Sequence, residues 1–292
     1  MRAVINKLIR KGLASLNLGE IILPVLSILL GMGIARKNAE LKNISQFIQF
    51  IFFIVILEVG SQLFQFYKND FGSIAKGNKD EIEKGAVLLL VILFYALSFL
   101  PFSQLFLRQQ NNFPFLITSA VTAFLFLTRR NFGKGAMPEF LSKVSYIFIN
   151  VFLLPLCLIS LYKTEINPIF ISIFQILFFM LFAFLFMQEV YQIEIIGNES
   201  GMVKLMGTIP MWKISTITLF IASILFILFA FRQPGIGLKI SSVVIAGLLI
   251  PVLGISISPF QHGKNGLIKS CRLIELMGAV IYLGLFFFLW LN

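Results

Sequence analysis

The stretch from Pro168 to Val190, PIFISIFQILFFMLFAFLFMQEV, decides the class of fold. It holds aliphatic and aromatic side chains almost without interruption, and its first charged residue is Glu189. A continuous apolar run of about 18 residues or more is long enough to cross the hydrocarbon core of a bilayer as a helix. We therefore predict a transmembrane helix over these residues.

The composition of the whole chain extends this prediction. Of its 292 residues, 58% are hydrophobic and 13% are charged, and the mean hydropathy is +0.94. A soluble domain normally has about a quarter of its residues charged. The values exclude a soluble protein and predict an all-α, polytopic membrane protein with a single transmembrane domain over residues 1–292. Nine apolar runs predict nine transmembrane helices: Leu18–Ala35, Ile44–Phe66, Gly85–Leu107, Phe113–Thr128, Phe140–Tyr162, Pro168–Val190, Ile214–Phe231, Ile240–Ser258 and Leu267–Leu291.

The distribution of Lys and Arg predicts the orientation in the membrane. A net charge of +11 is typical either of nucleic-acid binding or of the positive-inside rule, and the apolar runs favour the second interpretation and no nucleic-acid partner. The basic residues concentrate in the segments that are cytoplasmic when the N-terminus is inside. We therefore predict a multi-pass protein with a cytoplasmic N-terminus and the C-terminus on the opposite side, in a prokaryotic cell membrane. We predict an interfacial amphipathic helix over residues 1–17 and long cytoplasmic loops over residues 67–84 and 188–213.

Polar side chains interrupt the second predicted helix. Glu58, Gln62 and Gln65 are spaced by four and three residues, which places them on one face of a helix. An unpaired polar group is costly inside a bilayer, so this face should point into the bundle. It indicates either a polar cavity or a seam of interhelical hydrogen bonds. Cys157 and Cys271 lie in apolar runs and are predicted to be buried and free.

The sequence from Glu194 to Leu205, EIIGNESGMVKL, is the most specific local pattern in the chain. Together with the nine predicted spans and the two long polar loops, it resembles the UbiA superfamily of intramembrane prenyltransferases. The second motif of that family reads D-I-E-G-D-x-x-x-G-x-R-T-L. On this register Glu194 matches the first Asp, Asn198 the second, and Lys204 the basic residue. The resemblance implies a helical bundle around a central cavity that opens to the cytoplasm, capped by the loops 67–84 and 188–213.

The first motif of the family, N-D-x-x-D-x-x-x-D, can be aligned on two registers. On one, Gln62, Gln65 and Asn69 stand at the acid positions and keep the spacing at the end of the second helix. On the other, Asn69 and Asp70 form the N-D pair. Both registers depart from an Asp-rich motif. Asp70 and Asp80 are the only aspartates of the whole chain.

Basic residues near these segments are candidates for binding a diphosphate. The family tends to have a tyrosine followed four residues later by a lysine, where this chain has Phe126 and Arg130. Guanidinium and ammonium groups bind phosphate oxygens directly. The alternative interpretation is that these residues are topology signals alone. The resemblance implies that the diphosphate is bound by Lys68, Arg129, Arg130, Lys134 and Lys204, with Glu58 and Asp70 as polar residues of the cavity.

The resemblance implies the activity of a prenyltransferase. Its substrates would be an isoprenyl diphosphate and a lipophilic or aromatic acceptor, and internal capture of the allylic cation would make it a cyclase instead. The family's carboxylates hold Mg ions that neutralise the diphosphate. Here Glu194 and Asn198 are the candidate Mg ligands and the remaining motif acids are missing, which argues against a normal Mg site.

Two other functions are alternatives to a prenyltransferase. The first is an inactive lipid- or isoprenoid-binding protein or assembly subunit, and the second is a transporter or channel.

Overall fold

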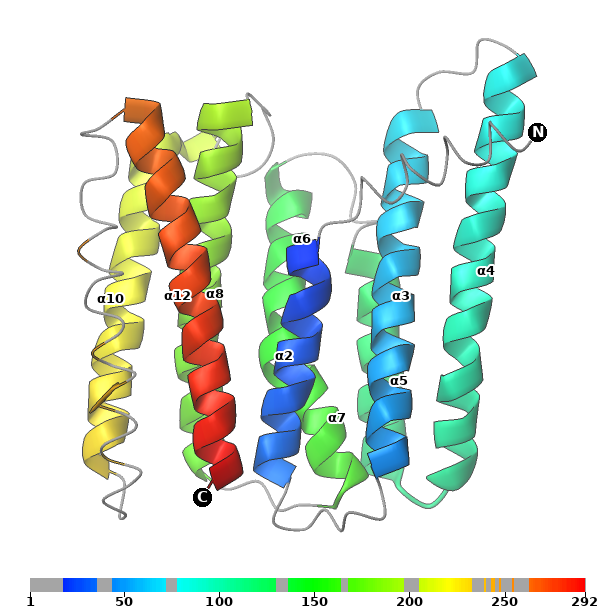
Figure 1. Ribbon diagram of the computed structural model, residues 1–292, viewed down its shortest axis with the longest axis horizontal. Helices are drawn as coiled ribbons and strands as arrows, with labels where there is room; N and C mark the ends of the chain where they lie inside the picture. Colours follow the sequence, from blue (N-terminus) through cyan, green and yellow to red (C-terminus); the bar gives the residue numbers. More distant parts are fainter. Residues whose placement is uncertain are drawn as a thin grey trace.

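The computed structural model describes residues 18–35, 44–71, 78–129, 136–163, 168–196, 205–232 and 263–291, and single residues or pairs between 239 and 254. The regular structure of these residues is helical throughout. The helices stand side by side in one bundle (Figure 1). From α2 to α8 successive membrane-crossing helices run in opposite directions, with α6, η3 and α7 forming one crossing, whereas α10 and α12 run in the same direction. Their bounds are α2 (Leu18–Ala35), α3 (Ile44–Phe71), α4 (Asn78–Arg108), α5 (Phe113–Thr128), α6 (Ala136–Phe148), η3 (Ile149–Leu153), α7 (Leu154–Leu161), α8 (Pro168–Tyr191), η4 (Gln192–Ile196), α10 (Thr208–Arg232) and α12 (Gly263–Leu291).

The lengths and compositions of these helices suit a membrane. Five helical segments in the described part are long and apolar enough to cross a bilayer: Ile44–Lys68, Lys84–Arg108, Met137–Leu161, Phe170–Ile195 and Thr208–Phe229. Two further apolar helices, Glu20–Ala35 and Phe113–Thr128, are shorter. The predicted all-α membrane fold is confirmed. Nine spans remain a prediction, because most of Ile240–Ser258 lies outside the described residues, as does the amphipathic segment 1–17.

The two predicted cytoplasmic loops are partly wrong. α3 continues to Phe71 and α4 begins at Asn78, so much of the predicted loop 67–84 is helical. α8 and η4 likewise continue to Ile196, and α10 begins at Thr208 within the predicted loop 188–213. A charged residue ends an apolar run, but outside the hydrocarbon core it does not end a helix, because Lys and Glu are good helix formers.

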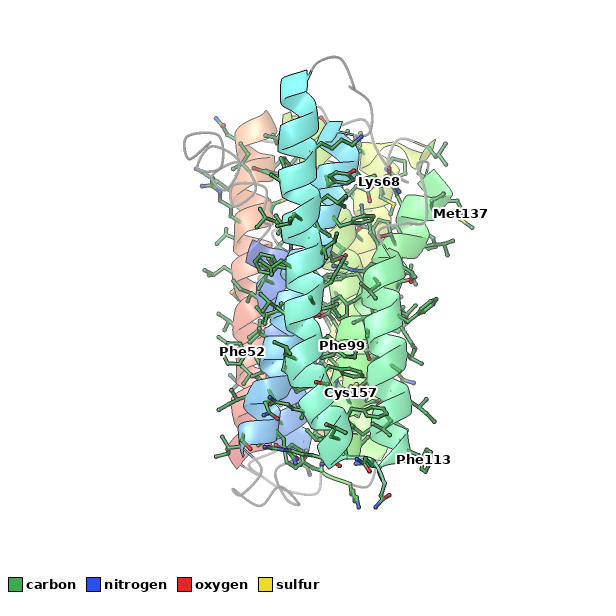
Figure 2. The ribbon with its side chains drawn as sticks, turned by 90° about the vertical axis from the view of Figure 1, so that its right-hand side faces the viewer. Phe52, Lys68, Phe99, Phe113, Met137 and Cys157 are labelled. Carbon is green, nitrogen blue, oxygen red and sulfur yellow. The ribbon has the colours of Figure 1, made fainter. Side chains whose placement is uncertain are left out.

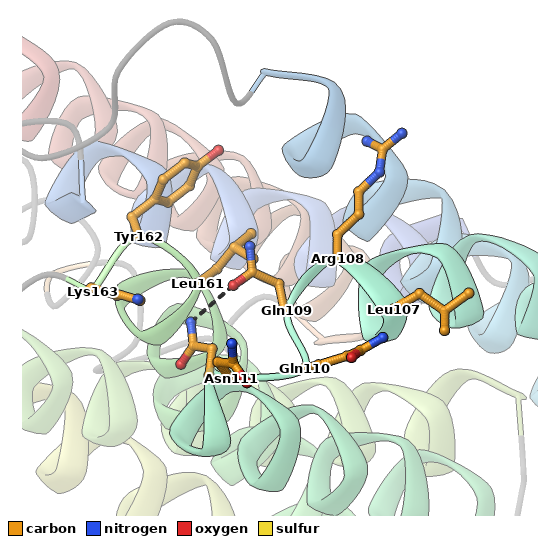
Figure 3. Close-up of a pocket in the computed structure, with 9 residues that line it drawn as sticks. Leu107, Arg108, Gln109, Gln110, Asn111, Leu161, Tyr162 and Lys163 are labelled. Carbon is orange, nitrogen blue, oxygen red and sulfur yellow. Dashed lines mark hydrogen bonds between the residues drawn. The ribbon is translucent and has the colours of Figure 1, made fainter.

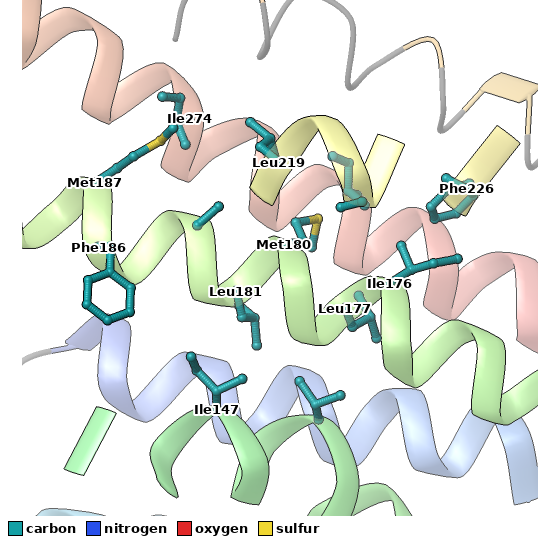
Figure 4. Packing of buried hydrophobic residues seen from close by; sticks show 14 of the residues in the cluster. Ile147, Ile176, Leu177, Met180, Leu181, Phe186, Met187, Leu219, Phe226 and Ile274 are labelled. Atoms are coloured by element: carbon teal, nitrogen blue, oxygen red, sulfur yellow. The ribbon is translucent and has the colours of Figure 1, made fainter. Parts of the chain in front are cut away.

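The outer surface of the bundle is apolar, as lipid requires. Phe52 and Phe99 project from α3 and α4 with 57% and 63% of their surfaces exposed (Figure 2). Inside, Phe186 and Leu177 of α8 are fully buried on the side that faces Ile147 of α6, and Met180 and Met187 are buried on the side that faces α10 and α12 (Figure 4). Cys157 and Cys271 are buried and free, as predicted.

A short π-helical segment, η3, interrupts the long helix that runs from Ala136 to Leu161. It comes directly before Pro155, which has no backbone N–H to donate to the preceding turn. α2 packs closely against the helix here: a Cβ atom on Gly31 would lie 2.8 Å from the Cα atom of Pro155. This close approach, typical of small residues in membrane helices, holds α2 against α7.

Candidate functional site

Several helix ends that carry the predicted site meet at one end of the bundle. α3, α5 and α8 finish there, and α2, α6, α10 and α12 begin there (Figure 1). Figure 2 shows Lys68, near the end of α3, and Met137, near the start of α6, at this end, with Phe113 at the other. We call it the motif end. The two segments that resemble the family motifs are therefore on the same side of the membrane bundle.

A buried ion pair joins α3 to the end of α5. Nη2 of Arg129 lies 2.6 Å from Oε2 and 2.7 Å from Oε1 of Glu58. The two side chains are 4% and 0% exposed. Gln62, one turn further along α3, donates from Nε2 to Glu58 Oε1 at 3.0 Å. Nε of Arg129 is buried and has no hydrogen-bond partner in the described residues.

Two more groups lie beside the Arg129 guanidinium. The ring of Tyr146 lies 4.3 Å from its Cζ atom, and Glu20 Oε2 lies 3.6 Å from Nη2. The Tyr146 hydroxyl donates to the backbone oxygen of Glu20 at 3.1 Å, which ties α6 to α2. Burial by itself lowers the pKa of Arg129, but the carboxylates of Glu58 and Glu20 outweigh it and raise the pKa above its ordinary value. Arg129 is therefore a permanent cation inside the bundle.

A second ion pair joins α6 to α8. Nζ of Lys143 donates to Oε2 of Glu189, whose side chain is 3% exposed. Oε1 of Glu189 is buried and accepts no hydrogen bond in the described residues. Lys143 also lies over the ring of Phe186, with Nζ 5.8 Å from the ring centroid. The ring of Phe182 lies next to that of Phe186, with 4.5 Å between the ring centroids. The Lys143–Glu189 ion pair is therefore next to two aromatic side chains.

One face of α6 and η3 links the two ion pairs. Glu139, Lys143, Tyr146 and Asn150 follow one another at intervals of four, three and four residues, so they share a face of the helix. α6 stands between α8 on one side and α3 with α5 on the other (Figure 1). Asn150 donates from Nδ2 to the backbone oxygen of Tyr146 at 2.8 Å, and its buried Oδ1 has no partner in the described part. A polar tract therefore runs from the motif end toward the middle of the bundle.

The sequence pattern identified one half of this tract. Glu58, Gln62 and Arg129 were predicted site residues, and they are in contact. Lys143, Tyr146 and Glu189 were missed, although the spacing of polar residues on α6 was a visible signal. Gln65 was predicted to share the face of Glu58, and it is exposed near the end of α3, whereas Gln62 is buried.

The other predicted residues divide into three groups. Lys68 is exposed near the end of α3, and Glu194 is half-buried on η4. Asn69 and Asp70 lie in the last turn of α3, where only the backbone is described. Asn198, Arg130, Lys134 and Lys204 lie outside the described residues.

The described residues alone do not fit a Mg site. They hold no group of three or more Asp, Glu, His or Cys side chains that could bind a metal ion. Glu58 and Glu189 each face a cation of the chain, and Glu194 is the one acid of the second motif in the described range. Mg²⁺ in such sites relies on carboxylates that are not already neutralised.

Comparison with known proteins identifies the architecture. No protein-family model and no curated protein matches the sequence. Among solved structures, a UbiA homologue from Archaeoglobus fulgidus bound to GPP and Mg²⁺ superposes with a TM-score of 0.59 at 16% identity, over 96% of this chain and 99% of that one. The chain has a UbiA-type fold. A second structure of a UbiA homologue from the same organism, bound to Cd²⁺, gives a TM-score of 0.57 over the same shares.

The UbiA-type fold confirms the resemblance to this superfamily at the level of the fold. The alignment covers nearly the whole of both chains, so α3, α6 and α8 belong to a common architecture and not to a local similarity. At 16% identity the likeness concerns the fold, and the roles of individual residues remain to be argued from their own chemistry.

Proposed function

We propose that this chain is a UbiA-like membrane prenyltransferase. It binds an isoprenyl diphosphate at the motif end and transfers the prenyl group to a lipophilic or aromatic acceptor. The observation that carries the proposal is the superposition, over 96% of the chain, on a UbiA homologue bound to GPP and Mg²⁺. In this proposal the motif end and the N-terminus both face the cytoplasm.

The diphosphate would be bound mainly by cations of the chain. Lys68 is exposed near the end of α3, and Arg130, Lys134 and Lys204 stand on the neighbouring connections. Arg129 holds Glu58 through Nη2, but its Nε–H has no partner in the described residues and can donate to a phosphate oxygen. Mg²⁺, when bound, would neutralise further charge on the leaving diphosphate. Its candidate ligands are Glu194 and Asn198.

The transfer step needs a dry, aromatic surrounding. Heterolysis of the bond between C1 and oxygen leaves both electrons on the diphosphate and an allylic cation on the prenyl chain. The Phe186 ring already lies under the Lys143 ammonium beside the polar tract, with Phe182 next to it, and aromatic rings of this kind stabilise a cation. The acceptor then donates an electron pair to C1 and loses a proton. Oε1 of Glu189, buried and without a hydrogen bond in the described part, is our candidate for receiving that proton.

A non-catalytic function is the second candidate, and a specific observation favours it. Both carboxylates buried in the polar tract, Glu58 and Glu189, are neutralised by Arg129 and Lys143. A protein of this kind would bind an isoprenoid or another lipid in the same tract without cleaving a diphosphate.

Binding and turnover of labelled diphosphates separate the two candidates. Purified protein in detergent would be given geranyl, farnesyl or geranylgeranyl diphosphate, with Mg²⁺ or with EDTA, and a membrane lipid extract as the source of acceptor. The enzyme predicts release of pyrophosphate, lost in Glu194→Gln and kept in a control, Gln175→Ala, on the exposed face of α8. Thermal stabilisation by a diphosphate without any release supports the binding protein. Neither stabilisation nor release, with all three chain lengths, contradicts the enzyme and the binding of an isoprenyl diphosphate.

A further inference from the structure

A pocket of about 480 Å³ lies at the end of the bundle opposite the motif end. It is formed by the turn between α4 and α5 and by the end of α7, and Figure 3 shows Arg108 and Lys163 on either side of Gln109. Its lining residues are Leu107, Arg108, Gln109, Gln110, Asn111, Asn112, Leu161, Tyr162 and Lys163. The proposed prenyl transfer uses none of them.

The floor of this pocket is held in place by hydrogen bonds. Asn112, which is 5% exposed, donates to the backbone oxygen of Ser160 at 2.7 Å and to Oε1 of Gln109 at 3.2 Å. Gln109 in turn donates to Gln46 of α3 at 3.2 Å. The shape of the pocket is therefore fixed by α3, by the turn before α5 and by α7.

The rim carries donors that the protein itself leaves unused. The side chains of Arg108, Gln110, Asn111 and Lys163 are exposed, and none makes a hydrogen bond or ion pair within the described part of the chain. Lys163 adopts a left-handed backbone conformation with φ of 52°, which is uncommon for a residue with a side chain. No acidic residue is among those that line the pocket.

The two cations are unusual for their side of the membrane. Arg108 and Lys163 are the single basic residues of the connections 108–112 and 163–167, and the predicted orientation places these connections on the side poor in Lys and Arg. The fold nevertheless brings both to one pocket. Glu165, in the second connection, lies outside the described residues.

Lipid-facing side chains adjoin the pocket. Leu107 is 63% exposed and Phe113 is 70% exposed, on the two helices that flank the turn. An anion bound between Arg108 and Lys163 would therefore lie next to an apolar surface that faces the lipid. A lipid headgroup needs such a surface for its acyl chains, whereas a free anion does not.

We propose that this pocket binds the phosphate headgroup of an anionic membrane lipid. Arg108 and Lys163 contact the phosphate, and Gln110 and Asn111 donate to its oxygens or to the polar part of the headgroup. The acyl chains lie along Leu107 and Phe113. The proposal is independent of prenyl transfer, because it involves the opposite end of the bundle.

Lipid titration of the detergent-purified full chain tests the site. Native mass spectrometry would follow binding of phosphatidylglycerol, of phosphatidylcholine and of inorganic phosphate. We expect phosphatidylglycerol to bind in preference to the other two, and the double variant Arg108→Gln/Lys163→Gln to weaken it by about tenfold, because the two lost charged contacts are exposed and each is weaker than a buried one. The matched control, Lys213→Gln/Lys269→Gln, removes two exposed cations from elsewhere and should bind as the unaltered chain does.

Three results would overturn the proposal. One is equal binding of phosphatidylglycerol by the double variant and the unaltered chain. Another is equal binding of phosphatidylcholine and phosphatidylglycerol, since the cations then contribute nothing. The third is displacement of the lipid by inorganic phosphate at similar concentration, which would identify a free anion as the ligand.

Discussion

Arg129 lies 2.6 Å from Glu58 across 71 residues of sequence, and both side chains are almost completely buried. The pair joins α3 to the end of α5, and Tyr146 and Glu20 extend it to α6 and α2. Four helices of the bundle therefore meet around one guanidinium. This pair has a structural role whichever of the proposed functions is correct.

Breaking the pair from one side should be more damaging than removing both charges. Glu58→Gln or Arg129→Gln leaves an uncompensated buried charge, and we expect each to lower the free energy of unfolding by about 3–5 kcal/mol. The double variant Glu58→Gln/Arg129→Gln should cost less than the two single changes added together. Reversible unfolding in detergent measures all three, with Gln175→Ala as the control. Additive effects would show that the two side chains are not coupled.

A variant that retains the charge of Arg129 but lacks its Nε–H distinguishes the role of this residue in folding from its role in binding the diphosphate. Arg129→Lys keeps a cation for Glu58 but has neither the Nε–H nor the planar guanidinium. We expect the variant to fold and its affinity for an isoprenyl diphosphate to fall by about tenfold, the usual effect of losing one charged hydrogen bond. Thermal shift against diphosphate concentration measures this affinity. Unchanged affinity would confine Arg129 to its structural role and remove it from the diphosphate site.

Glu189 should affect transfer more than binding. Glu189→Gln keeps the size of the side chain and a hydrogen-bonding oxygen for Lys143, but the amide cannot take up a proton. We expect turnover to fall by about a hundredfold or more, which is typical of a lost general base, with no change in the affinity for the diphosphate. Single-turnover formation of the prenylated acceptor, followed as a function of diphosphate concentration, gives both values. Full turnover in this variant would assign the proton transfer to another group.

The close packing of α2 on α7 can be tested at Gly31. A Cβ atom there would lie 2.8 Å from the backbone of Pro155, which cannot rotate away. Gly31→Ala should lower the free energy of unfolding by about 1–3 kcal/mol, the common effect of overpacking. Gly85→Ala is the matched control, because no atom lies within 4 Å of its added Cβ. Equal stability of the two variants would contradict the close approach of these helices.

The sequence predicted the helices well and the contacts between them poorly, for physical reasons. Apolar runs of membrane length have one stable conformation in lipid, so α8 could be predicted from its composition alone. Its continuation through η4 to Ile196 could not, because hydropathy does not distinguish a helix in water from a loop.

The candidate site shows the same division. Glu58 and Gln62 were predicted to share a polar face because their spacing is local. Arg129, which pairs with Glu58, was predicted only as a diphosphate ligand. The pairing itself could not be predicted, because a contact across 71 residues depends on how α3 and α5 pack. Glu189 stands at the end of an apolar run, and its importance appears only when Lys143 of α6 is placed beside it.

The opposite ends of the bundle should be exposed on opposite sides of the membrane. Lys213, near the start of α10, and Gln110, in the turn after α4, are both exposed, and the native thiols Cys157 and Cys271 are buried. In intact cells, a membrane-impermeant maleimide should label Gln110→Cys, should label Lys213→Cys only after permeabilisation, and should leave the unaltered chain unlabelled. Lys213 belongs to the side rich in basic residues, which the positive-inside rule places in the cytoplasm. The reverse labelling pattern would invert the predicted orientation, and labelling of both cysteines from the same side would exclude the successive crossings by α5, by α6 with α7, and by α8 that separate them.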